Sequence, residues 1–323
     1  MLRDDAQAPG RCAGRAISFV AWSFPPAWVA TVAVRLIVGP FPEVAPGASL
    51  ASVPEFWPYA ALFAFVVLLP PAVAWLLARR WEVSTRRWGL RVGHAGQAVL
   101  VAPLVALAMA ALATALPIAA GVGRLDLSAM GQVQRLGEAG RFEEALEEKL
   151  DRDESPHPIG TRVVSGLLTG LIFGVLLAPI VELPWRGLLQ TELRWLGFAR
   201  SSLLVGVLAA AWWLPVLACG PGCRPELPLL GTWLATLALL GVPLSWLRLS
   251  AGSIIPASVL AASWASLSEL PLMAVRGGTE LQIEVAKLAA VALVAGAALV
   301  WSPRQADAEP PRRRAESGAA DCL

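Results

Sequence analysis

Glu182 and Arg186 are a carboxylate and a guanidinium that stand four residues apart in the string PIVELPWRGLLQTEL, at the end of a long apolar segment. On a helix this spacing places both groups on one face, although Pro184 between them is expected to kink the helix. Charged groups inside a membrane span are energetically costly, so this carboxylate is a candidate for chemistry such as general-base catalysis. The alternative is a salt bridge that anchors a helix end, and physical reasoning alone favours this structural role.

The chain offers few other groups for such chemistry. Its two histidines, His94 and His157, fall in loops expected on opposite sides of the membrane, so they cannot share a site. A metal would need several His or carboxylate ligands at one point, and no H-E-x-x-H or G-x-S-x-G string is present. The serines between 258 and 268 have no Lys or His near them in sequence and are expected to pack between helices. We therefore expect no metal and no cofactor.

The elements that must position this pair are membrane-spanning helices. Charged residues make up 15% of the 323 residues, against about 25% in soluble domains, and they cluster between apolar spans. Eight spans have about the 20 residues that a helix needs to cross the hydrocarbon. They lie at 17–38, 56–78, 97–120, 163–182, 202–218, 227–247, 253–275 and 282–301. The expected fold is therefore all-α, with an eight-span membrane domain over 17–302 in the lipid bilayer. The net charge of +2 gives no indication of a nucleic-acid partner.

The distribution of Lys and Arg predicts the orientation of the spans. Most of these 26 residues fall in the N-terminal segment 1–16 and in the loops and tail on the same side, whereas the short loop 40–55 has none. Both termini are therefore predicted to be cytoplasmic. The excess of Ala, Gly and Arg indicates a bacterial protein, and hence a bacterial inner (plasma) membrane. Of the charged residues near span ends, Arg35, Glu284 and Lys287 are expected to reach the membrane surface.

Two polar segments lie outside the predicted spans. The acidic insertion 121–161 carries apolar residues at roughly helical spacing, which predicts an amphipathic helix lying on the membrane or on the helix ends. The tail 303–323 is polar and charged and is predicted to be disordered. Cys219 and Cys223 flank a short outer loop, where the environment allows a disulfide bond.

The string VELPWRGLLQ resembles the first motif of the CPBP family, which includes the CAAX prenyl proteases and the bacteriocin-processing or self-immunity proteins. That motif has two glutamates, three variable residues and an arginine, commonly followed by glycine. Its second glutamate, its arginine and its glycine match Glu182, Arg186 and Gly187. The strings AAAWWLPVLA and GSIIPASVLAASWASL resemble the second and third motifs, so the resemblance covers roughly 165–270. The RWGLR string at 87–91 also suits the family.

The resemblance fails at the residues that the family uses for catalysis. The first glutamate, which activates the attacking water, falls on Val181, and the histidine of the second motif falls on Trp213. The histidine and asparagine of the third motif fall on Ala261 and Ala265. The resemblance therefore implies an intramembrane protease fold whose active site has been lost.

The sequence leads to one favoured function and two alternatives. The favoured function is that of a non-catalytic pseudoprotease, which binds a membrane peptide or partner helix. The first alternative is an active intramembrane endopeptidase of the CAAX-processing type, with displaced catalytic groups. The second is a membrane scaffold or a transporter, although few ionisable groups are placed to line a transport path.

Overall fold

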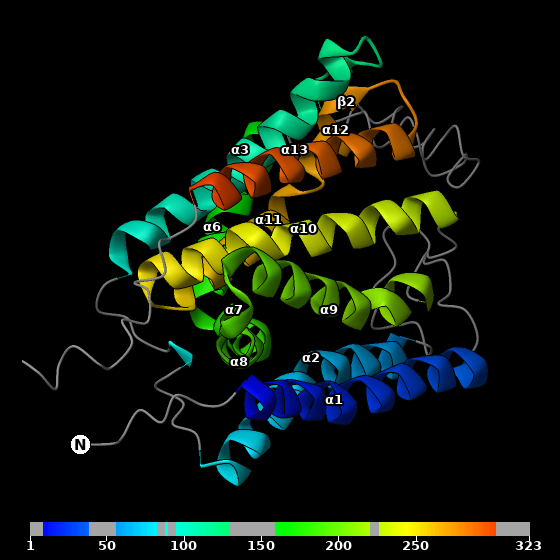
Figure 1. Ribbon diagram of the computed structural model, residues 1–323. Helices are drawn as coiled ribbons and strands as arrows, with labels where there is room; N and C mark the ends of the chain where they lie inside the picture. The colour runs from blue at the N-terminus through cyan, green and yellow to red at the C-terminus, as the bar shows by residue number, and fades with distance from the viewer. Residues whose placement is uncertain are drawn as a thin grey trace, which may run out of the picture.

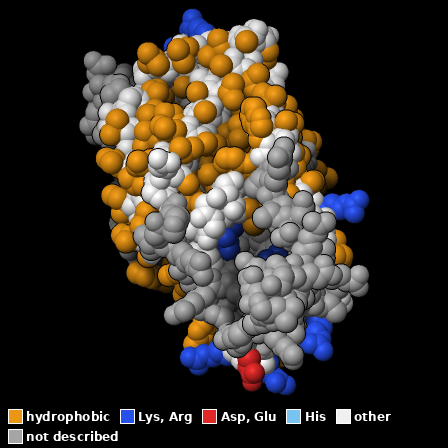
Figure 2. All heavy atoms as spheres, turned by 60° about the vertical axis from the view of Figure 1, so that its left-hand side comes forward, with side chains coloured by type: hydrophobic (Ala, Val, Ile, Leu, Met, Phe, Trp, Pro, Cys, Tyr) orange, Lys and Arg blue, Asp and Glu red, His pale blue; other side chains and the backbone are white. Residues whose placement is uncertain are grey.

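The structure is a computed structural model that describes residues 9–38, 56–82, 88–89, 95–128, 159–219 and 226–301 (Figure 1). In this part of the chain, seven helices are long and apolar enough to cross a membrane. They are α1 (Pro9–Val38), α2 (Phe56–Arg80), α3 (Gly96–Ala119), α6 (Ile159–Leu176), α9 (Phe198–Cys219), α10 (Leu227–Ala251) and α13 (Glu280–Val300). The prediction of an all-helical, multi-pass membrane protein is confirmed. Figure 2 shows one face on which hydrophobic side chains cover much of the described surface, as expected where helices meet lipid.

The predicted span 253–275 is not one continuous helix, so the count of eight spans is not confirmed. It is divided into α11 (Ile255–Leu267) and α12 (Leu270–Ala274). Pro271 lies in the first turn of α12, a position that tolerates proline. In the middle of one continuous helix, its missing N–H and its ring would break the helical hydrogen bonding. The 13 residues of α11 are too few to cross the hydrocarbon without α12.

The predicted span 163–182 also differs from one straight helix. After α6 the chain continues through α7 (Ala178–Glu182), a π-helix η3 (Leu183–Leu189), α8 (Gln190–Glu192) and a 3₁₀ turn η4 (Arg194–Leu196). Pro184 is the second residue of the π-helix. A wider π turn accommodates the proline where a kink is predicted, and such turns are frequent at functional sites.

Two hydrophobic clusters hold the bundle together. The first joins α1, α2, η3 and α9, and it includes Phe19, Trp185 and Trp212. The second joins α3, α6, α10, α11 and α13. Helices α9 and α10 pack closely because Gly206 and Gly241 face each other: a Cβ atom at Gly241 would lie 2.5 Å from the Cα atom of Gly206. In Figure 1, α1 and α2 lie along one edge of the bundle, and α3 and α13 lie along the other.

Three glycines spaced four residues apart set the distance between α6 and α11. A Cβ atom at any of them would lie 2.5 Å or less from an atom of α11. Small residues at this spacing allow the backbones of membrane helices to approach closely. The glycines are Gly166, Gly170 and Gly174, and they face Leu267, Ser263 and Val259 in that order.

A two-stranded antiparallel sheet lies at the end of the bundle where α3 ends. Strand β1 (Arg124–Leu125) pairs with β2 (Val275–Arg276), so that Arg124 lies opposite Arg276. The sheet fixes the first residues of the predicted insertion 121–161. Residues 129–158 of that insertion, the tail 303–323, both histidines and the loop of the predicted disulfide lie outside the described residues.

Candidate functional site

Glu182 and Arg186 form a buried ion pair at the junction of α7 and the π-helix. Glu182 Oε2 lies 3.6 Å from Arg186 Nε, and the two residues are 8% and 2% exposed. The prediction that they share one face of the helix is confirmed. The junction is central to the fold, because α7 contacts α2 and α11, and η3 contacts α2, α9 and α10.

Several polar atoms of this pair are left without hydrogen-bond partners among the described residues. They are Glu182 Oε2 and the Nε and Nη1 atoms of Arg186. The 3.6 Å separation is that of an ion pair and is too long for a hydrogen bond. Buried polar atoms in native proteins nearly always have a partner, either protein or ordered water. The pair can therefore still accept an N–H from one polar group and donate to another.

A second arginine, Arg248 at the end of α10, fixes the backbone of the motif. Its Nε donates a hydrogen bond to the main-chain carbonyl of Arg186 over 3.3 Å. Gly89 packs against the guanidinium so closely that a Cβ atom there would lie 2.4 Å from Arg248 Cζ, and its φ of +81° also favours glycine. The Gly89 carbonyl accepts a hydrogen bond from the Ile254 N–H at 3.0 Å.

Trp88, from the RWGLR string, covers the same turn. It is fully buried, and a Cβ atom at Gly187 would lie 3.1 Å from Trp88 Cβ. From the sequence alone, this string is only a feature of the family resemblance. The structure shows that its central residues pack directly against the first motif.

Gln190 continues the polar face by another turn and ties three helices together. Its side-chain amide donates to Ser201 Oγ at 3.1 Å and accepts from Ser245 Oγ at 2.8 Å. All three residues are buried and belong to α8, α9 and α10. Sequence reasoning missed this network because residues far apart in the chain supply it. The spacing Glu182, Arg186, Gln190 was the one available signal.

The tryptophan of the first motif anchors the opposite side of the π-helix. Trp185 packs edge-on against Phe19 of α1 at 5.8 Å between ring centroids, and it lies 6.1 Å from Trp212 of α9. Phe24 contacts both tryptophans, at 6.4 and 5.3 Å. This aromatic cluster holds the motif in place through apolar packing.

The four positions onto which the resemblance places the family's catalytic residues carry valine, tryptophan or alanine. Trp213 is half-buried and packs beside Phe63 of α2, with ring centroids 6.2 Å apart. Ala261 packs on the second hydrophobic cluster, whereas Ala265 is exposed and Val181 is half-buried. Neither of the two pockets found among the described residues is lined by these positions or by the ion pair.

Metal-binding groups do not converge in the described part of the chain. No three His, Cys, Asp or Glu side chains lie together there. His94 and His157 lie outside it. The donor set that the described residues provide is the single Glu182 carboxylate beside a guanidinium, which is unsuited to hold a divalent cation.

A second buried charge cluster lies in the last membrane helix, and it corrects an expectation. Lys287 and Glu284 do not extend to the surface of the protein, because they are only 5% and 2% exposed. Lys287 Nζ lies 2.7 Å from Glu284 Oε1 and 3.6 Å from Glu269 Oε1. A charged side chain can stay within the helices when a partner of opposite charge is within reach, and sequence position alone does not reveal that partner.

Comparison with known proteins agrees with the family resemblance. Residues 164–267 match the family model described as "Type II CAAX prenyl endopeptidase Rce1-like". A search of curated proteins found no match to the chain. The matched residues include most of α6, the π-helix with Glu182 and Arg186, and α9 to α11. The resemblance expected from the sequence is thus confirmed over nearly the same residues, and the chain is a multi-pass membrane protein that carries an Rce1-like region of the CPBP family.

Proposed function

We propose that this protein is a non-catalytic member of the family that binds a membrane peptide or partner helix without cleaving it. The observation that carries the proposal is the occupancy of the four catalytic positions by Val181, Trp213, Ala261 and Ala265. Loss of a general base costs about 10²–10⁴ in rate, and loss of an oxyanion donor costs about 10²–10³. Trp213 packs on Phe63, which supports the proposal because a large apolar ring stands where the family places a histidine.

The Glu182–Arg186 pair supports the binding half of the proposal. It is buried and keeps unused hydrogen-bonding atoms where α7 and the π-helix meet the surrounding helices, so a peptide would reach it only if these helices moved apart. A peptide backbone offers one N–H and one C=O per residue, and this matches a carboxylate beside a guanidinium. Glu182 would accept an N–H and Arg186 would donate to a carbonyl, with no proton transfer.

The test is reconstitution of the purified protein in liposomes with prenylated and with unmodified membrane peptides. We expect no cleavage above a protein-free control, and saturable binding measured by energy transfer between labelled protein and peptide. Glu182→Gln keeps the shape but removes the charge, and it should weaken binding about tenfold. Ser268→Ala, an exposed change near the end of α11, is the matched control and should leave binding unchanged. Cleavage that Glu182→Gln abolishes in a folded protein would establish the alternative, an active endopeptidase.

The proposed location is a plasma membrane of the bacterial type, with both termini in the cytoplasm. The test is cysteine labelling in a background in which the four native cysteines are alanine. Arg80→Cys, exposed at the end of α2, should react only from the cytoplasmic side. Ser128→Cys, exposed just after β1, should react only from the other side. Labelling of both positions from one side would refute the proposed topology.

A further inference from the structure

Helix α2 ends in two adjacent arginines whose charge is not neutralised by other described residues. Arg79 and Arg80 lie in its last turn, and both are exposed. Within the described part of the chain, neither guanidinium forms a hydrogen bond or an ion pair. Helix α2 contains no acidic residue, and Glu82, which follows it, is exposed. One carboxylate and about half a negative charge from the helix C-terminus do not cancel two guanidinium groups, so the end of α2 is positive.

The first of these arginines is oriented by an aromatic ring. Arg79 Cζ lies 3.6 Å from the centre of the ring of Trp75, one helical turn earlier. A guanidinium that stacks through its flat face keeps its N–H groups, which lie in the plane of the group, available as donors. Trp75 is 44% exposed, so the stack lies on the outer surface of the bundle. The arginine is therefore held in place without use of its hydrogen-bonding capacity.

An apolar stripe leads along α2 to the arginines. The exposed side chains at helical spacing on the face of Arg79 are Leu68, Ala72, Trp75 and Leu76. From Leu68 to Arg79 the helix rises about 16 Å, which is about half of the hydrocarbon thickness and hence one leaflet. The 25 residues of α2 span about 37 Å, so its last turn extends beyond the hydrocarbon to the level of the lipid headgroups.

We infer that the end of α2 binds an anionic phospholipid, with the phosphate held by Arg79 and Arg80 and an acyl chain along the apolar stripe. Guanidinium groups bind phosphate oxygens through paired N–H donors. Basic residues next to a membrane helix attract anionic lipids. The stripe favours a lipid over a free phosphate, because it provides an apolar surface of one leaflet's length directly beside the two charges.

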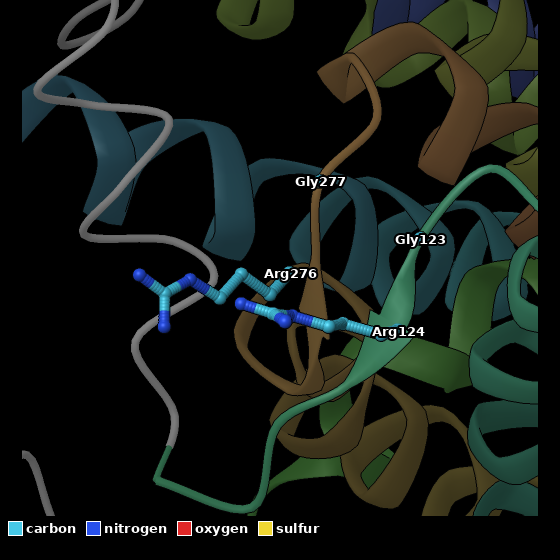
Figure 3. Close-up of a pocket in the computed structure, with 4 residues that line it drawn as sticks. All are labelled: Gly123, Arg124, Arg276 and Gly277. Atoms are coloured by element: carbon cyan, nitrogen blue, oxygen red, sulfur yellow. The ribbon is translucent and has the colours of Figure 1, made fainter.

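The arginine pair of the β1–β2 sheet is not an equivalent site. Arg124 lies opposite Arg276, and Figure 3 shows that both side chains extend to the same side of the strands. Arg276, however, already takes part in another interaction, and so do its chain neighbours Val275 and Gly277. At the end of α2, by contrast, both charges remain available for a ligand.

The experiment measures thermal unfolding of the purified full chain in detergent during titration with phosphatidylglycerol or with phosphatidylcholine of the same acyl chains. We expect only phosphatidylglycerol to raise the unfolding temperature in a saturable way, measured for each variant from its own lipid-free value. Arg79→Gln with Arg80→Gln should weaken its apparent affinity about 30-fold. The control is Arg194→Gln with Arg200→Gln, which removes two exposed charges from η4 and α9 and should leave the affinity unchanged.

A second pair of variants tests the aromatic support. Trp75→Leu keeps an apolar side chain but removes the ring under Arg79, so it should weaken phosphatidylglycerol binding about threefold. Trp22→Leu, the control, removes an exposed tryptophan of α1 that no described arginine covers, and it should have no effect.

Three results would overturn the site. Equal binding by wild type and the Arg79→Gln, Arg80→Gln variant would exclude these arginines as ligands of the phosphate. An equal loss in both double arginine variants would replace the site with general charge attraction. An equal response to both lipids, or protection by inorganic phosphate as strong as that by the lipid, would show that the ligand is not an anionic phospholipid.

Discussion

Replacement of Gly170 by leucine is expected to lower the free energy of unfolding by about 3 kcal/mol, the upper end of the usual cost of overpacking. A Cβ atom at this position would lie 2.2 Å from Ser263 Oγ and 2.5 Å from Ser263 Cα. The second contact is with backbone, so rotation of the serine side chain cannot relieve it. Helices α6 and α11 would have to separate, and the family-matched region includes α11 and most of α6. Denaturant unfolding of the purified protein in micelles measures the change.

Gly296→Leu is the matched control for this prediction. Gly296 is exposed on α13, and a Cβ atom there meets nothing within 4 Å. Leucine has the better helix propensity, so this variant should be as stable as wild type or more stable by up to ~1 kcal/mol. Gly170→Ala should also destabilise the protein. Ser263→Gly combined with Gly170→Ala should recover only part of that loss, because Ser263 Cα remains in the way. Equal stability of Gly170→Leu and Gly296→Leu would show that α6 and α11 do not pack through their backbones.

Replacement of Lys287 by methionine is expected to lower the free energy of unfolding by about 3–5 kcal/mol. The substitution leaves Glu284, which is 2% exposed, without the cation that lies 2.7 Å from its carboxylate. Breaking a buried ion pair costs this much because the remaining charge is uncompensated. Glu269 offers no compensation, since it is negative and its side chain is about half exposed.

The double variant Lys287→Met with Glu284→Gln is expected to recover most of the loss, because removal of both charges also removes the desolvation penalty. Arg200→Met removes a cation from an exposed position and should change the free energy of unfolding by no more than about 0.5 kcal/mol. The same unfolding measurements in micelles apply. A double variant that is less stable than Lys287→Met alone would contradict the ion-pair explanation and point to a separate role for the Glu284 carboxylate.

The sequence predicted those features that depend on local composition. Long apolar runs predicted eight spans, and seven helices of the described residues are long and apolar enough to cross a membrane. The four-residue spacing predicted the Glu182–Arg186 pair. The division of the span 253–275 was missed, although Pro271 marks it, because hydropathy continues across the break between α11 and α12. The mean hydropathy of a segment does not change when one helical hydrogen bond is lost.

The parts that could not be predicted depend on contacts between distant segments. Arg248 lies just outside the predicted span 227–247, yet its Nε donates to the carbonyl of Arg186 and its guanidinium packs against Gly89. Lys287 was expected at the membrane surface, yet Glu284 and Glu269 hold it inside the bundle. Only the packing of the helices decides whether a charged side chain in a span reaches water or reaches another charge.

The chain leaves the bundle after β1 and re-enters it at the start of α6 at neighbouring points. The Ile159 N–H donates to the carbonyl of Leu127 over 3.3 Å, and β1 is paired to β2 just before this point. The two ends between which the intervening segment must run are therefore neighbours. Doubling the length of a closed loop costs only about 0.6 kcal/mol, so segments of very different size can be grafted between Ser128 and Ile159 while the bundle folds as before. At that junction, segments of different length can replace one another while the same set of membrane helices is kept.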